Sequence, residues 1–236
     1  MNEKGALLLL PNLLGEHPHH EMFLPVSVDR AVATLDGLIA ESEKEGRRFL
    51  SRFKTKKPAR EIPIALFNKN TPEEDLDFYL EPVEKGERWG LISDAGLPCI
   101  ADPGSLLVKR ARQKGLTVQA FVGPSSILLA LMLSGIPAQK FTFHGYLHKT
   151  PTTRTQQIQK LEQSDGAQVF IEAPHRNTQT LEDLIQTLEE RTLLCVATDL
   201  TLVTQKVLCY SIKHWRKISR PNIDKKPTTF ILFLDK

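Results

Sequence analysis

Apolar runs alternate with helical patterns through the first part of the chain. The expected strands are Ala6–Leu10, Phe49–Phe53, Ile62–Phe67, Trp89–Ser93 and Leu116–Val122. The expected helices are Val28–Glu45, Thr71–Lys85, Asp102–Gly115 and Ile127–Leu133. The first helix is inferred from the helical spacing of its apolar residues, Val28, Val32, Leu35, Leu38 and Ile39. Strands that alternate with helices predict a mostly parallel sheet with helices on both faces.

The second part of the chain has a different order of predicted helices and strands. Helices are expected at Thr152–Gln163 and Thr178–Glu190. The expected strands are Phe141–Leu147, Val169–Glu172, Leu193–Thr198, Lys206–Ser211 and Thr229–Leu234. The last three strands follow one another closely, and such short returns predict a mixed or antiparallel sheet. The chain is therefore expected to form two α/β domains, 1–139 and 140–236.

Composition narrows the class of protein. Hydrophobic residues make up 41% of the 236 positions, which is enough for a substantial core. The excess of 31 Lys and Arg over 28 Asp and Glu gives a net charge of +3, which permits a nucleic-acid partner without requiring one. The three cysteines have no CxxC spacing, so a reduced cytoplasmic setting is expected. Leu7–Leu14 is too short and too broken by Pro11 for a signal peptide or membrane span, and no membrane is expected as a partner.

Two turns rich in small residues follow predicted strands. Ser93-Asp94-Ala95-Gly96 continues to Asp102 and Gly104, and Gly123-Pro124-Ser125-Ser126 follows a later strand. We expect both at the carboxyl ends of neighbouring strands, where open α/β sheets bind ligands. Neither turn has the spacing of a dinucleotide or P-loop site. The residues alone favour a small polar ligand; ordinary strand-to-helix turns, capped by Asp102 and Ser125, are the alternative.

Four segments in order resemble the tetrapyrrole-methylase superfamily. Ser93–Gly104 is similar to its SDAGTP…DPG motif, and Gly123–Ser126 fits the second loop of the branch that methylates ribose 2′-hydroxyls of small-subunit ribosomal RNA. Phe143–Leu147 resembles that branch's F-x-G-[FY]-L segment, and Phe170–Arg176 its F-Y-E-[SA]-P-H-R segment.

The resemblance implies S-adenosylmethionine as cofactor, held in a cleft between two α/β domains, and a homodimer. It also implies that the residues contacting the cofactor are Ser93, Asp94, Ala95, Gly96, Leu97, Asp102, Gly123, Ser125, Ser126, Ile127, Glu172 and Thr228.

Three segments depart from the branch. Its T-P-I-G-N-L-x-D turn becomes Leu10–Glu16, which keeps the proline and an acidic end. We match its E-D-T-R segment, which follows the second strand, to Phe49–Arg52, which keeps the arginine and loses both acids. Its R-E-L-T-K segment becomes Thr198–Leu202. The altered segments indicate a changed substrate side.

Candidate substrate contacts are the basic side chains Arg52, Lys54, His175 and Arg176. The run Arg47–Arg60 is expected to hold RNA phosphates, or else to be a solvated surface. His17, His19 and His20 lack metal-ligand spacing, so we expect a polar loop and no metal. Cys99 is expected to fill the core rather than act as a nucleophile, since no base is marked nearby.

Three functions remain open. The first is a methyltransferase acting on the ribose of ribosomal RNA, which the basic run favours. The second is a methyltransferase for a tetrapyrrole or another small molecule. The third is a non-catalytic relative that binds the cofactor or RNA. No residue is marked by the sequence as the catalytic base.

Overall fold

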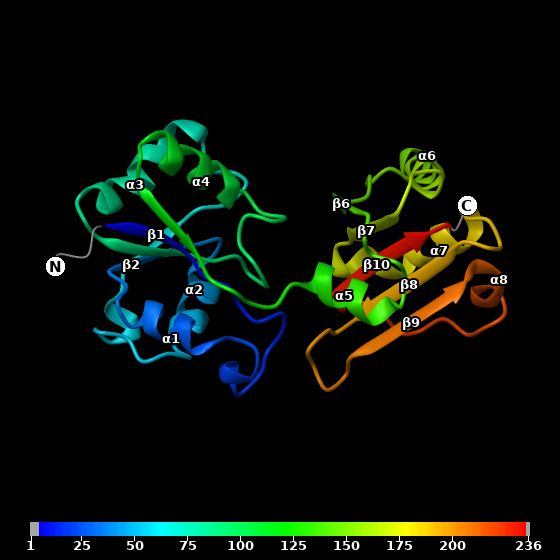
Figure 1. Ribbon diagram of the computed structural model, residues 1–236, viewed down its shortest axis with the longest axis horizontal. Helices are drawn as coiled ribbons and strands as arrows, with labels where there is room; N and C mark the ends of the chain where they lie inside the picture. Colours follow the sequence, from blue (N-terminus) through cyan, green and yellow to red (C-terminus); the bar gives the residue numbers. More distant parts are fainter. Residues whose placement is uncertain (1–4, 235–236) are drawn as a thin grey trace. The chain divides into compact units, whose positions relative to one another are not determined.

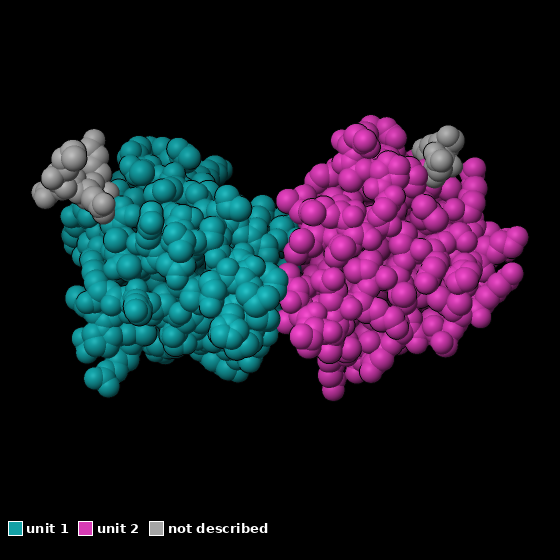
Figure 2. Space-filling model, turned by 60° about the horizontal axis from the view of Figure 1, so that its bottom comes forward, with its two compact units in different colours: residues 1–125 teal, residues 126–236 magenta. Residues whose placement is uncertain are grey.

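A computed structural model describes residues 5–234 of the chain. The chain forms two compact units, 1–125 and 126–236, which are coloured separately in Figure 2. The division falls before α5 (Ser126–Ser134), ahead of the predicted boundary at 139/140. The reason is that α5 contacts β8 (Leu193–Thr198), β9 (Lys206–Ser211) and β10 (Thr228–Phe233) of the second unit.

The sheet of the first unit is parallel throughout, as predicted (Figure 1). Its strand order is β3-β2-β4-β1-β5. The strands are β1 (Ala6–Leu9), β2 (Gly37–Ala40), β3 (Ile64–Leu66), β4 (Arg88–Leu91) and β5 (Thr117–Ala120). The helices are α1 (Val26–Val32), α2 (Glu43–Leu50), α3 (Leu76–Glu84) and α4 (Gly104–Gln113).

Two hydrophobic clusters lie on opposite faces of this sheet. Alternate residues of β1 separate them, because successive strand side chains point to opposite sides. Leu8 packs in one cluster with side chains of α1 and α2, whereas Leu7 packs in the other with side chains of α3 and α4. Helices therefore cover both faces, which confirms the predicted architecture of this unit.

The prediction for residues 28–53 was wrong. The expected single helix Val28–Glu45 is a helix, a strand and the start of a second helix, and the expected strand Phe49–Phe53 lies at the end of α2 and in the turn after it. All four residues of β2 are buried, so the strand lacks the alternation that would distinguish it from a helix. Ser42 accepts a hydrogen bond from the Glu45 N–H and caps α2.

The sheet of the second unit is mixed, as predicted. Its order is β6-β7-β10-β8-β9, with β6 (Phe141–Tyr146) parallel to β7 (Ala167–Ile171) and the other pairs antiparallel. The remaining helices are α6 (Pro151–Glu162), α7 (Asn177–Thr187) and the short α8 (Ile212–Trp215). The core joins these helices to the sheet, with Phe170 and Phe230 stacked at a centroid distance of 5.4 Å. Among residues 5–234, no helix is both long and apolar enough to cross a bilayer.

Candidate functional site

The loop after β4 is fixed by one buried side chain, Asn12, which follows β1. The Asn12 carboxamide donates hydrogen bonds to the main-chain oxygens of Ser93 (3.1 Å) and Asp94 (3.0 Å). The Asn12 N–H donates to the Gly96 oxygen at 2.8 Å. Because Asn12 is only 2% exposed, these bonds are shielded from water and hold the Ser93–Gly96 main chain in one conformation.

The two predicted glycine loops approach each other closely. Gly96 has a φ of +72°, and a Cβ there would lie 3.1 Å from Leu14 Cδ2 and 3.4 Å from the Pro124 oxygen. A Cβ on Gly123 would lie 2.0 Å from Pro11 Cβ, so the Gly123 backbone lies directly against the turn after β1. The sequence predicted that β4 and β5 would be neighbouring strands, and this was wrong, because β1 lies between them. The two loops therefore meet over the end of β1.

Three carboxyl groups beside these loops have raised pKa values. Burial is the main cause for Asp94, and the nearby charges of Glu45 and Asp102 add to it. Burial also raises the pKa of Glu41, followed by the charge of Asp94, although the Asp94 N–H bonds the Glu41 carboxylate and opposes the shift. Burial raises the pKa of Asp102. Among the described residues, neither Asp94 nor Glu41 has a cationic partner, so a positively charged ligand group would lower the energy of both.

Asp102 caps the turn that leads into α4. Its carboxylate accepts hydrogen bonds from the Cys99 N–H at 2.9 and 3.0 Å and from the Gly104 N–H at 2.7 Å. The N-cap of α4 is Pro103, so Asp102 fixes the turn before the helix and is not the helix cap that the alternative expected. Burial raises the pKa of the Cys99 thiol to about 12, so the thiol stays protonated at neutral pH, in agreement with a packing role.

Glu41 was missed by the sequence reasoning, and the cause is the misplaced second strand. The strand that precedes the E-D-T-R segment is β2, which ends at Ala40. The residues in that position are therefore Glu41-Ser42-Glu43-Lys44, and the match to Phe49–Arg52 was wrong. Set against E-D-T-R, Glu41 keeps the first acid, whereas Ser42 replaces the second acid and Lys44 replaces the arginine, so this segment is altered less than the match to Phe49–Arg52 suggested.

The remaining predicted cofactor residues are divided between the units. Leu97 lies in the loop after β4 and Ser125 ends the first unit, whereas Ser126 and Ile127 begin α5 in the second. Thr228 begins β10 and is buried. Its hydroxyl donates to the Lys226 oxygen at 3.1 Å and lies 3.3 Å from the Thr198 hydroxyl.

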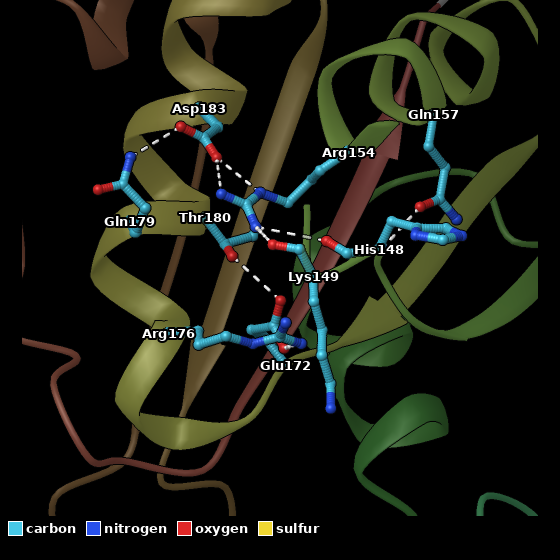
Figure 3. A network of polar contacts seen from close by, with 9 residues as sticks. All are labelled: His148, Lys149, Arg154, Gln157, Glu172, Arg176, Gln179, Thr180 and Asp183. Atoms are coloured by element: carbon cyan, nitrogen blue, oxygen red, sulfur yellow. Dashed lines mark hydrogen bonds and ion pairs between the residues drawn. The ribbon is translucent and has the colours of Figure 1, made fainter. Parts of the chain in front are cut away.

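Glu172 is buried within a polar network of the second unit (Figure 3). Its carboxylate accepts hydrogen bonds from the Ala173 N–H (2.7 Å) and the Thr180 hydroxyl (3.1 Å) and forms an ion pair with Arg176. Nε and Nη1 of Arg176 are buried and have no hydrogen-bond partner among the described residues. Glu172 thus positions Arg176 within its own unit, while two guanidinium donors remain unsatisfied. His175 is exposed in the 3₁₀ turn Pro174–Arg176.

Most cations of the run Arg47–Arg60 already have partners. Arg47 donates to the oxygens of Ala59 (2.9 Å) and Ile62 (2.7 Å), and Arg52 donates to Asn12 Oδ1 at 2.8 Å. Carboxylates pair with the rest of the engaged cations, as in Arg48–Glu16, Arg48–Glu45, Lys56–Asp36 and Arg60–Glu61. Lys54 and Lys57 are exposed with no ion pair among the described residues. The run is thus tied largely to its own unit.

The histidine cluster forms contacts of its own. His20 Nε2 lies 2.9 Å from the Asp29 carboxylate, and His17 Nδ1 accepts a hydrogen bond from the His19 N–H at 3.2 Å. Within residues 5–234, no three His, Cys, Asp or Glu side chains are grouped as metal ligands. The cluster therefore packs the segment before α1.

Curated relatives share substantial sequence with this chain. A protein of Xylella fastidiosa (strain Temecula1) named ribosomal RNA small subunit methyltransferase I is 34% identical over 175 residues, 74% of this chain and 62% of the relative. Proteins of the same name from Haemophilus influenzae and Thermotoga maritima are 31% and 29% identical and cover 85% and 80% of this chain. These matches cover 70% and 85% of those two relatives. The chain thus spans less than two thirds of the length of the Xylella relative.

Solved structures and a family model agree on the fold. The methyltransferase CobJ has a TM-score of 0.67 at 16% identity, covering 97% of this chain and 93% of CobJ. The cobalt precorrin-4 methyltransferase CbiF has a TM-score of 0.65 at 12% identity, covering 98% of this chain and 96% of CbiF. The model of the tetrapyrrole (corrin/porphyrin) methylases matches residues 24–214. With most of its length matched by that model, the chain belongs to the tetrapyrrole methylase family.

Proposed function

We propose that this protein is an S-adenosylmethionine-dependent methyltransferase that acts on a ribose 2′-hydroxyl of small-subunit ribosomal RNA. The observation that carries the proposal is the pinned glycine loop at the carboxyl edge of the first sheet, in a chain whose relatives at 28–34% identity are named ribosomal RNA small subunit methyltransferase I.

The first unit offers groups that suit this cofactor. S-adenosylmethionine carries a cationic sulfonium and an ammonium group. Asp94 and Glu41 are carboxylates with raised pKa values and without cationic partners among the described residues, so they favour a ligand of positive charge. The Gly96 and Gly123 backbones lack side chains where the two loops meet, which lets Leu14 and Pro11 pack directly against them and keeps the two loops close together. These residues would hold the cofactor.

The cofactor supplies the methyl group, and the protein supplies alignment. Methyl transfer from a sulfonium is an in-line displacement, for which orientation can contribute ~7–11 kcal/mol. Asn12 serves this purpose by fixing the Ser93–Gly96 main chain through three hydrogen bonds. Asp102 serves it by fixing the turn into α4. The carboxylates of Asp94 and Glu41 would hold positive charge beside this rigid main chain.

We further propose a homodimer in the cytoplasm. The support for a dimer is α5, which is apolar on nearly every side and leaves Met132 77% and Leu133 48% exposed. Cytoplasmic location follows from the proposed substrate. Light scattering coupled to gel filtration should give twice the chain mass of 26.6 kDa, and Met132→Glu should shift it towards the monomer. A parent protein that runs as a monomer would contradict the dimer.

The function is tested by methyl transfer to defined acceptors. We would incubate the protein with tritiated S-adenosylmethionine and small ribosomal subunits that lack ribose methylation, and then locate the label by nuclease digestion and mass spectrometry. Label on a 2′-hydroxyl is expected. Label on a base would contradict the assigned atom. Label only on an added precorrin would favour a tetrapyrrole acceptor, and cofactor binding without transfer to either would favour a non-catalytic relative.

A further inference from the structure

The strands of the second unit bring several cationic residues to one end of their sheet, where β6, β7 and β8 end and β9 and β10 begin. β6 and β7 are parallel, so Lys149 and the turn Pro174–Arg176 follow them at the same edge. β10 runs antiparallel to β7 and β8, and Thr228 pairs with Thr198, so the segment before β10 lies there too. Thr198 also pairs with Lys206 at the start of β9. We call this set the cationic edge; its members are Lys149, His175, Arg176, Lys206, Lys225 and Lys226.

The main chain that carries these residues is fixed. The buried Arg154 side chain donates to the oxygens of His148 (3.3 Å) and Lys149 (3.1 Å) and pairs with Asp183 (Figure 3). The Lys225 N–H donates to the Pro174 oxygen at 3.1 Å, which joins the segment before β10 to the turn after β7. The edge is therefore ordered before any ligand arrives, and preorganised groups bind with a smaller loss of entropy.

Positive charge exceeds negative charge at this edge. Arg176 pairs with Glu172, and Lys226 lies 3.3 Å from Asp199. Asp224 is a third acid on the connecting segment. The five Lys and Arg residues against these three acids leave a net charge of +2.

Three exposed lysines of the edge are available to a ligand. Lys149, Lys206 and Lys225 have no ion pair among the described residues. Arg176 is held by its ion pair with Glu172, and its Nε and Nη1 are buried, so the exposed lysines are the groups that a ligand can reach.

The width of the edge favours an anion with charges spread over a long span. Lys149 follows β6 at one side of the sheet and Lys206 begins β9 at the other, with β7, β10 and β8 between them. Four strand intervals of about 4.8 Å separate them by ~19 Å. One carboxylate of a small molecule cannot contact cations so far apart, whereas successive phosphates of a nucleic-acid strand can.

We propose that the cationic edge of the second unit binds the phosphate backbone of the RNA substrate and that the run Arg47–Arg60 does not. This inference rests on the proposed function. The contrast between the two surfaces supports it, because most cations of the run contact groups of their own unit. Within the described residues, two of the seven cations of the run, Lys54 and Lys57, have no ion pair or side-chain hydrogen bond, whereas three of the five Lys and Arg residues of the edge have none.

The test compares three charge-matched variants. The edge variant is Lys149→Gln/Lys206→Gln/Lys225→Gln. The control variant changes three exposed lysines of the same unit at the opposite end of the strands, Lys160→Gln/Lys213→Gln/Lys217→Gln. The run variant is Lys54→Gln/Lys57→Gln/Arg60→Gln. Each loses the same charge, and glutamine keeps a polar, unbranched side chain. Binding of a labelled small-subunit ribosomal RNA fragment is measured by fluorescence anisotropy at several salt concentrations, and S-adenosylmethionine binding by calorimetry.

The edge variant should flatten the slope of log affinity against log salt by roughly 2, because each lost phosphate contact releases about 0.7–0.9 fewer ions. The control and run variants should keep the parent slope, and all three should keep the parent's cofactor affinity. An edge variant with the parent slope, or a control variant that loses as much, overturns the inference while the parent's methyl transfer leaves the function standing. A parent that binds S-adenosylmethionine but no RNA overturns both the inference and the RNA substrate.

Discussion

Arg52 Nη1 donates a 2.8 Å hydrogen bond to Oδ1 of Asn12, a residue 40 positions earlier in the chain. The same carboxamide uses its nitrogen to hold the main chain of Ser93 and Asp94. The arginine thereby orients the amide that fixes the loop. Burial lowers the pKa of Arg52, a sign that its charge is held partly away from water. Arg52 therefore acts on the proposed cofactor loop, which differs from the RNA contact that the sequence suggested.

Asn12→Ala tests the pinning of the loop. The change leaves the oxygens of Ser93 and Asp94 without their donors, and each unsatisfied buried group costs about 1–3 kcal/mol. We expect the free energy of unfolding to fall by about 2–4 kcal/mol in urea denaturation and the affinity for S-adenosylmethionine to fall at least tenfold. Asn70→Ala, at an exposed position, is the control and should change neither quantity. Parent-like affinity in Asn12→Ala would show that the loop conformation does not depend on Asn12.

Gly96→Ala tests the close approach of the two loops, and the chain offers a matched control. Gly96 and Gly115 have nearly equal φ angles, +72° and +69°, so alanine meets the same backbone strain at both. A Cβ at Gly96 would lie 3.1 Å from Leu14, whereas nothing lies within 4 Å of a Cβ at Gly115. Both variants should lose about 1 kcal/mol of stability from the positive φ. Only Gly96→Ala should weaken cofactor binding in calorimetry, and equal affinities in the two variants would show that cofactor binding does not depend on the close packing of the two loops.

The alternation of strands and helices made most of the fold predictable, and the failures have local causes. Strands with clear turn signals, such as β4 and β5, were placed within a few residues. β2 was missed because Leu38 and Ile39, buried on both faces of the sheet, continue the helical spacing of Val28 and Val32. A single misread strand then displaced the E-D-T-R match.

The site was predictable only where it is local in sequence. Gly96 is marked by its own turn, and its positive φ agrees with the expectation for glycine in a tight loop. The role of Asn12 depends on Ser93 and Asp94, more than 80 positions away, and no local pattern encodes that pairing. Likewise, the sequence showed that Arg47–Arg60 is rich in Lys and Arg, but not which groups those side chains contact. The acids and main-chain oxygens that engage that charge are brought there by folding.

Asp94→Asn tests the electrostatic strain in the loop. Burial raises the pKa of Asp94, so the folded protein holds this proton more tightly than the unfolded chain does. The ionised carboxylate therefore costs stability as pH rises through the raised pKa, and the cost disappears on acidification. Asp94→Asn should raise the melting temperature at pH 8 and lose this advantage towards pH 4.

The same change should weaken S-adenosylmethionine binding, because a negative charge that faces the cationic groups is removed. In the parent, affinity should fall as pH drops through the raised pKa, since protonation removes the same charge. Calorimetry and thermal denaturation across pH check both effects. Asp224→Asn, at an exposed position in the second unit, should show neither effect. A destabilised Asp94→Asn at pH 8 would contradict the burial argument.

The pairing of Glu172 with Arg176 can be tested by a double-mutant cycle. Glu172→Gln leaves the guanidinium without its carboxylate, and breaking a buried pair in this way costs ~3–5 kcal/mol. The lower end is expected because the Arg176 side chain is still 19% exposed. Arg176→Gln leaves Glu172 with the Ala173 N–H and the Thr180 hydroxyl. The double variant, having no unpaired charge, should lose less than the sum of the single changes, with a coupling of at least ~1 kcal/mol in urea denaturation.

The resemblance also implies a cofactor contact at Glu172, and calorimetry separates the two roles. If Glu172 acts only by positioning Arg176, cofactor affinity should be unchanged in every variant that folds. A loss of affinity in Glu172→Gln that is absent from Arg176→Gln would instead identify Glu172 as a cofactor ligand.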